Sequence, residues 1–150
     1  MATFTLEKHG HLAVLTLVSH EKRNLLTPQI ALEIADAVNK LTDDVEIKAL
    51  AVTGLQNSFC AGADLDALLE AANGDGEELQ QIYSAFTSVA HSPLLTIALV
   101  NGPALGAGMN LAMACDIRIA SGDAWFESRF FTLGIHPGGG HSWLLPQLVG

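Results

Sequence analysis

The sequence has few basic residues. Seven Lys and Arg stand against sixteen Asp and Glu, so the formal net charge is −9 at pH 7. A chain with this charge repels the phosphate backbone of a nucleic acid unless basic residues gather locally. The one adjacent basic pair is Lys22 and Arg23. We therefore predict that the protein binds no nucleic acid, although a single basic pair is enough to contact a phosphorylated small molecule.

Long apolar runs and cysteine clusters are also missing. No stretch approaches the roughly 20 apolar residues that span a bilayer. The first residues lack the basic-then-apolar pattern of a signal peptide. Cys60 and Cys115 have no metal-ligand spacing, so we expect free thiols in a reducing compartment. These absences predict a cytoplasmic protein with no membrane partner and no metal site.

Three common motifs of catalytic or nucleotide-binding sites are incomplete or missing. Gly106 and Gly108 are followed by Leu111 at the position where the dinucleotide fingerprint requires glycine. The sequence has no phosphate-loop lysine, and no serine stands in the nucleophile-elbow pattern. These gaps argue against a dinucleotide-binding enzyme, a P-loop nucleoside triphosphatase and a hydrolase with a nucleophile elbow.

What the sequence does have is a high apolar content and alternating elements. Its 150 residues are 49% hydrophobic, which predicts one domain with a large core or a covered interface. The alternation of strands and helices favours an α/β fold with parallel strands joined by crossovers. The expected strands are 4–7, 12–17, 47–53, 94–100, 116–120 and 124–126, and the expected helices are 28–41, 65–72, 79–89 and 141–149.

Two segments share one design, in which a strand leads through a loop of small residues into a helix. They are AVTGLQNSFCAGADLDALLE (51–70) and LTIALVNGPALGAGMNLAMA (95–114). Ligands of α/β sheets bind beyond the carboxyl ends of the strands, and the first amides of a helix can donate to negative charge. Two such units on neighbouring strands could form an oxyanion hole. The alternative is that the small residues only allow tight packing of helix against sheet.

Two motifs within these segments resemble the crotonase family, the enoyl-CoA hydratases and isomerases. They are SFCAGADL (58–65) and NGPALGAGMNLAMACDIRIA (101–120), and EKRNLLTP (21–28) and FFTLGIHPGGGHSWLLPQLVG (130–150) extend the resemblance over almost the whole chain. The resemblance implies an α/β spiral of ββα units, with residues 1–150 as a single core domain. The resemblance also implies a C-terminal helical region that supports a homotrimer or dimer of trimers, and because the last apolar segment has no closing signal, we expect the chain to stop before it.

The resemblance also implies a ligand and the residues that bind it. The substrate would be an acyl- or enoyl-CoA thioester in fatty-acid or related metabolism, with coenzyme A as part of the substrate and no separate cofactor. The backbone N–H groups of Ala61 and Ala107 would polarise the thioester carbonyl and stabilise the enolate. The residues implied in substrate binding are Lys22, Arg23, Leu25, Ala61, Gly62, Ala63, Asp64, Leu65 and Ala107.

The acids that the family uses in catalysis are absent at all three aligned positions. Hydratases of the family carry glutamates where this sequence has Asn110 and Phe130, and isomerases carry an acid where it has Gly138. Without these acids the general-base contribution, about 100- to 10,000-fold, would be lost unless another group supplies it. We therefore expect hydration by the two-glutamate route to be inefficient.

Three interpretations of Asn110 are open. It orients a water or a substrate oxygen in altered chemistry, it marks a protein that binds acyl-CoA without turnover, or it is an ordinary first-turn helix residue. Glu127 and His136 are candidate replacement bases, with a surface glutamate and a loop histidine as the favoured alternatives, whereas His141 and Asp116 are expected to cap or pack. The leading hypothesis is an acyl-CoA-binding member of the family, and the alternative is a non-catalytic carrier or partner-binding subunit.

Overall fold

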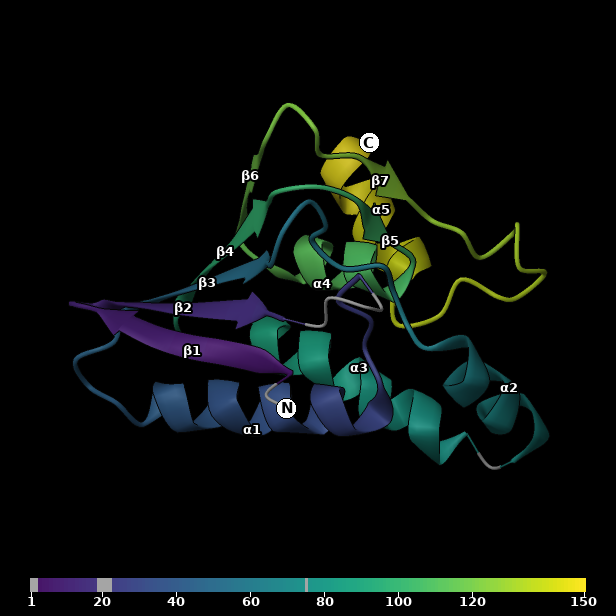
Figure 1. Cartoon of the computed structure of the whole chain (residues 1–150), viewed down its shortest axis with the longest axis horizontal. Helices are drawn as coiled ribbons and strands as arrows, with labels where there is room; N and C mark the ends of the chain where they lie inside the picture. The colour runs from purple at the N-terminus through teal and green to yellow at the C-terminus, as the bar shows by residue number, and fades with distance from the viewer. Residues whose placement is uncertain (1–2, 19–22, 75) are drawn as a thin grey trace.

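The computed structural model describes residues 3–18, 23–74 and 76–150 (Figure 1). A five-stranded sheet runs through it in the order β1-β2-β3-β4-β6. The first pair is an antiparallel hairpin with Gly10 in its turn at φ +61°, and the remaining pairs are parallel. The strands are β1 (Phe4–His9), β2 (Leu12–Leu17), β3 (Ala49–Gly54), β4 (Leu95–Val100) and β6 (Ile117–Ala120).

Each predicted helix forms, including the one expected after the second loop of small residues. Thr27 caps the first helix, where its Oγ1 accepts from the Ile30 amide at 3.3 Å, and Pro28 takes the first helical position. Its apolar face is buried as the 3.6-residue periodicity predicts. The helices are α1 (Pro28–Thr42), α2 (Leu65–Asn73), α3 (Glu77–Ala90), α4 (Ala107–Ala114) and α5 (His141–Val149).

Repeated ββα units make up the second half of the chain. Strand β4 is followed by the short β5 (Ala104–Leu105) and then α4; strand β6 is followed by β7 (Phe126–Glu127) and then α5. The short strands pair with each other in a second sheet, and a bridge between Cys60 and Ala104 adds the first unit to it. The predicted spiral of ββα units is confirmed, although the short strand expected at 124–126 lies at 126–127.

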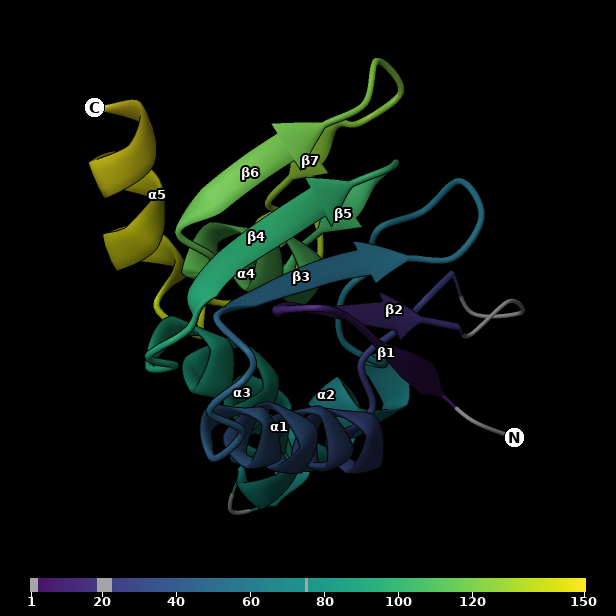
Figure 2. The same cartoon turned by 90° about the vertical axis from the view of Figure 1, so that its left-hand side faces the viewer.

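The large sheet is covered on one face, contrary to what the apolar run at 94–100 predicts. Strand β4 is central, between β3 and β6, and such strands are usually buried on both faces. Figure 2 looks onto the face that no described helix covers. On that face Leu95 is 48% exposed and Ile119 57% exposed, whereas Ala98 and Val100 point into the core. The apolar run therefore supplies side chains to both faces of the sheet, and the described residues bury one of these faces.

Helix α4 packs directly on the segment that follows β3, and Gly108 makes this possible. A Cβ at Gly108 would lie 2.3 Å from the Cys60 carbonyl oxygen and 2.7 Å from its Cβ. Both neighbours are held by the backbone, so an added methyl group has no room.

We expect Gly108→Ala to lower the free energy of unfolding by about 1–3 kcal/mol, as overpacking of a rigid contact does. The matched control is Gly122→Ala, because a Cβ there meets no atom within 4 Å. Urea unfolding of both variants measures the difference. Equal losses in the two variants would contradict the packing described here.

Candidate functional site

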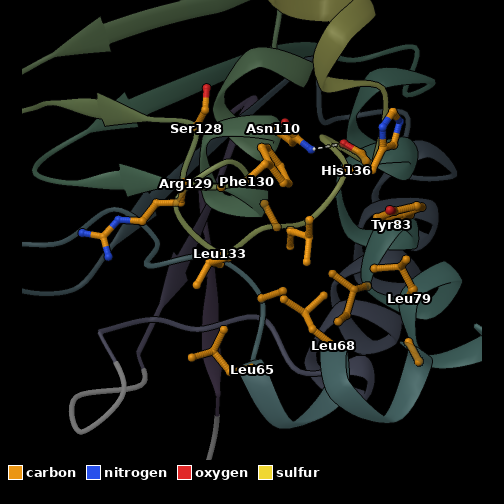
Figure 3. Close-up of a pocket in the computed structure, with 18 of the residues that line it drawn as sticks. Leu65, Leu68, Leu79, Tyr83, Asn110, Ser128, Arg129, Phe130, Leu133 and His136 are labelled. Carbon is orange, nitrogen blue, oxygen red and sulfur yellow. Dashed lines mark hydrogen bonds between the residues drawn. The ribbon is translucent and has the colours of Figure 1, made fainter. Parts of the chain in front are cut away.

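A cavity of about 430 Å³ lies beyond the carboxyl ends of β3 and β4, where the two loops of small residues meet. The first loop contributes Ala61 to Ala63, and the second contributes Gly106 and Ala107. One end of the cavity is apolar, with Leu65, Leu68 and Leu79 in its wall (Figure 3). Asn110 and Ser128 lie at the other end. The two predicted units therefore face one cavity with a polar and an apolar end.

Two backbone amides at this cavity have no acceptor among the described residues. They belong to Ala63 and to Ala107, the first residue of α4. The two loops touch, since a Cβ built on Gly62 would lie 3.7 Å from the Ala107 nitrogen. A carbonyl oxygen in the cavity is the kind of acceptor that such free donors bind.

The amide of Ala61 is not available, which corrects the prediction for that residue. Its N–H donates to the Arg23 carbonyl at 3.0 Å. This bond joins residues 38 apart in the chain, so the loop sequence alone does not reveal it. Ala63 lies two positions further on. Its neighbours bond to Leu26, since the Gly62 carbonyl accepts from the Leu26 amide and the Asp64 amide donates to the Leu26 carbonyl. The Ala63 amide itself donates to no described residue.

Two buried or half-buried asparagines that sequence reasoning missed fix the loops. Asn24 is 2% exposed, and its Nδ2 donates to the Ser58 carbonyl at 2.9 Å. Asn101 donates from Nδ2 to the carbonyls of Gly54 and Gln56 at 2.7 and 2.6 Å. Each links chain segments more than 30 residues apart. The backbone donors at the cavity are therefore held by polar anchors as well as by packing.

The three positions at which the resemblance implies acids all line this cavity. Asn110 is 1% exposed, and its Nδ2 donates to the Gly138 carbonyl at 3.1 Å. Its Oδ1 lies 2.7 Å from Nδ1 of His141. The interpretation of Asn110 as an ordinary first-turn residue does not account for these contacts, because both ends of the amide are engaged in the interior.

The other two positions are filled in different ways. Phe130 is 9% exposed and packs its ring on His141, with the centroids 4.8 Å apart. At Gly138 a Cβ would lie 2.1 Å from the Tyr83 hydroxyl oxygen. Burial raises the pKa of that phenol, opposed by a hydrogen bond from the Gly139 backbone, so Tyr83 is neutral at pH 7. The tyrosine hydroxyl thus occupies the space of a side chain at 138.

The candidate replacement bases lie apart from the polar end or on its rim. Glu127 forms an ion pair with Nε of Arg129 at 3.0 Å and does not line the cavity. His136 lines the cavity from an exposed loop. Asp116 accepts from the amide and the hydroxyl of Thr96, both at 2.8 Å, and these bonds lower its pKa. Asp116 therefore bonds to β4 instead of capping a turn, and no carboxylate side chain belongs to the described cavity wall.

The polar end contains a contact that sequence reasoning missed. Ser128 lines the cavity, and its Oγ lies 2.8 Å from Nε2 of His141. His141 is 4% exposed, and burial lowers its pKa. It was expected only to cap or pack. It does open α5, but its ring bridges Ser128 and Asn110.

The residues implied in coenzyme A binding are divided between the cavity and its surroundings. Leu25, Gly62, Ala63, Leu65 and Ala107 line the cavity. Arg23 instead borders a smaller neighbouring pocket of about 260 Å³, and Lys22 lies outside the described residues. Asp64 is buried as the N-cap of α2, with Oδ1 accepting from the Asp66 amide at 3.0 Å. Its described contact is thus one of helix capping.

Both cysteines are free and buried, and burial raises the pKa of each thiol to about 12. Neither is therefore a thiolate nucleophile at neutral pH. The described residues contain no group of three or more His, Cys, Asp or Glu arranged to hold a metal ion. No helix among them is both long and apolar enough to cross a bilayer.

Comparison with known proteins gives consistent matches. The sequence profile of the family described as enoyl-CoA hydratase/isomerase matches residues 7–150. A probable enoyl-CoA hydratase of Mycobacterium tuberculosis, EchA14, is 44% identical over 142 residues, which cover 93% of this chain and 55% of that protein. A crotonyl-CoA hydratase of Syntrophomonas wolfei is 40% identical over 147 residues, covering 97% and 56%.

Solved structures show the same similarity. The crystal structure of an enoyl-CoA hydratase from Polaromonas sp. JS666 matches with a TM-score of 0.88 at 32% identity, over 96% of this chain and 58% of that one. The chain thus spans little more than half the length of each of these proteins.

Proposed function

Because the chain belongs to the enoyl-CoA hydratase/isomerase family, we propose that its cavity binds an acyl- or enoyl-CoA and polarises the thioester carbonyl. The donors are the backbone N–H groups of Ala63 and Ala107. The observation that carries the proposal is that these two amides reach one cavity with no described acceptor. Preorganised donors of this kind act most strongly on an oxygen that becomes negative, such as the oxygen of an enolate.

The apolar end of the cavity supports an acyl chain as the group bound there. Leu65, Leu68 and Leu79 lie on α2 and α3, away from the polar end (Figure 3). Burial of each methylene contributes about 0.8 kcal/mol, so affinity should rise with chain length until the apolar end is full. On this proposal the nucleotide part of coenzyme A runs toward Leu25 and Arg23, and the Arg23 guanidinium contacts a phosphate.

A specific observation favours a second candidate function, that of an acyl-CoA-binding protein without hydratase turnover. The described cavity wall contains no carboxylate, and it includes Asn110, Phe130 and Gly138, the three positions at which the resemblance implies acids. Such a protein would serve as a carrier or as a partner-binding subunit. Turnover separates the two functions, because both require binding of the thioester.

The test uses the full-length protein and a crotonyl-CoA labelled with ¹³C at the thioester carbonyl. Equilibrium titration measures binding, and infrared difference spectra measure the carbonyl stretch. We expect binding together with a shift of the carbonyl band to lower frequency, since two hydrogen bonds weaken the C=O bond. Binding without a band shift would reject the two amide donors, and absence of binding would reject the proposed function itself.

The proposal also includes the longer domain and the oligomer to which the chain would belong. Residues 1–150 would form the first part of a longer domain, since each compared relative extends well beyond the matched residues. A homotrimer, or a dimer of trimers, is the proposed assembly, on the basis of the family resemblance. The apolar side chains on the open face of the sheet, such as Leu95 and Ile119, are consistent with burial in a larger unit.

A further inference from the structure

Three side chains form a continuous hydrogen-bonded chain at the polar end of the cavity. Ser128 Oγ lies 2.8 Å from Nε2 of His141, and Nδ1 of His141 lies 2.7 Å from Oδ1 of Asn110. A hydroxyl, an imidazole that contacts it and a third group that orients the imidazole are the parts of an activated nucleophile. We infer that these residues hydrolyse the thioester of bound acyl-CoA through an acyl-enzyme at Ser128. The inference takes its substrate from the proposed function.

The orientation of Asn110 determines which nitrogen of His141 holds the proton. Nδ2 of Asn110 faces the carbonyls of Gly138 and Gly139 at 3.1 and 3.5 Å, and only an NH₂ group can donate to them. Oδ1 must then face His141, where it accepts from Nδ1–H. This leaves the lone pair of Nε2 to accept from the Ser128 hydroxyl. Asn110 therefore fixes the tautomer in which His141 can accept the proton of Ser128.

The environment of His141 keeps the imidazole neutral and in place. The residue is 4% exposed, and burial lowers its pKa, so it is unprotonated at neutral pH and free to accept a proton. The Phe130 ring packs against it at a tilt of 60°. At position 130, hydratases of the family are expected to have a carboxylate. This chain instead has a phenyl ring there, which packs against the imidazole of His141.

Ser128 lies beside the proposed amide donor of Ala107. It directly follows β7, and the Glu127 carbonyl accepts from the Gly106 amide at 2.8 Å, next to the start of α4. In Figure 3 its hydroxyl lies at the end of the cavity with Asn110 and points away from Leu65 and Leu68. A bound acyl-CoA would then place its thioester at this polar end and its acyl chain among the leucines.

The reaction needs only water as a second reactant. Ser128 Oγ bonds to the thioester carbon as its proton passes to His141 Nε2, and the carbonyl oxygen becomes an oxyanion at the two amides. Collapse breaks the C–S bond, and the coenzyme A sulfur takes the proton from Nε2. Water then attacks the ester and gives a proton to Nε2. Cleavage of the C–Oγ bond releases a carboxylic acid, and Ser128 recovers its proton.

The experiment compares the full-length wild-type protein with Ser128→Ala, His141→Gln and the control Ser142→Ala. Ser142 is exposed on α5 and outside the chain of hydrogen bonds. Butyryl-CoA and octanoyl-CoA are the probes. Release of free thiol measures hydrolysis, intact mass after an acid quench measures the acyl adduct, and titration of each variant measures binding.

We expect wild type and Ser142→Ala to release thiol and to carry an acyl adduct that maps to Ser128. Ser128→Ala should bind both probes, form no adduct and hydrolyse them at least about 100-fold more slowly. His141→Gln should lose a similar factor, because the hydroxyl then has no base. A fluorophosphonate should label Ser128 in the wild-type protein and in Ser142→Ala, which gives a readout that needs no substrate binding.

A purely structural chain of hydrogen bonds predicts a different outcome. Wild type would bind the probes, release no more thiol than Ser128→Ala and resist the fluorophosphonate, and that result would overturn the inference while leaving the proposed function in place. Failure of the wild type to bind either probe would overturn both.

Discussion

Replacing Ala107 with proline is expected to lower the rate of acyl-CoA turnover by about 100- to 1,000-fold, the usual effect of removing one donor from an oxyanion hole. The substitution removes the N–H of Ala107 and adds nothing that could replace it as a donor. Ala107 is the first residue of α4, and its amide has no described acceptor. Proline is well tolerated at the first position of a helix, so the helix itself should form.

The matched control is Ala107→Gly, which removes the methyl group and keeps the N–H. Turnover of octanoyl-CoA by the two variants, together with the infrared shift of the bound carbonyl, separates loss of the donor from loss of packing. We expect the band shift to shrink in the proline variant alone. Equal turnover in the proline variant and the wild type would show that Ala107 donates nothing to the reacting oxygen.

Local sequence patterns predicted the elements well, because those elements depend on neighbouring residues. Thr27 and Pro28 mark the start of α1, and the small residues around Gly62 and Gly106 mark the two loops of the cavity. The open face of the sheet was not predicted. An apolar run such as that of β4 is compatible with burial of both faces of the strand. Which faces are buried depends on the elements packed against the sheet, and the described residues bury only one face.

The details of the site depend on contacts between distant residues, and these were missed. Ala61 differs from Ala63 because the Arg23 carbonyl crosses the loop and takes the amide of Ala61. No local pattern distinguishes the two alanines. Ser128 and Asn110 lie 13 and 31 positions from His141, and they meet only because α5 begins beside α4. Of the three, Ser128 and Asn110 line the cavity, whereas His141 is buried and is not part of its described lining.

Phe130→Glu is expected to raise the rate of 2-enoyl-CoA hydration by at least about 100-fold over the wild type, the lower range of a positioned general base. Position 130 lines the cavity, and glutamate is smaller than phenylalanine, so its side chain takes up less space than the ring it replaces. The variant loses the ring that packs on His141, so its unfolding must be measured alongside. Loss of the enoyl absorbance reports hydration, and a parallel thiol assay corrects for thioester hydrolysis.

The same acid introduced at the other two positions serves as the control, and we expect neither to restore hydration. Asn110→Glu would set carboxylate oxygens against the Gly138 carbonyl that now accepts from Nδ2, and it would remove the partner of His141 Nδ1. Gly138→Glu requires Tyr83 to move, since its hydroxyl lies 2.1 Å from the new Cβ. Hydration restored by Asn110→Glu but not by Phe130→Glu would mean that water binds on the α4 side of the cavity, and that the contacts of Asn110 can be rearranged to admit it.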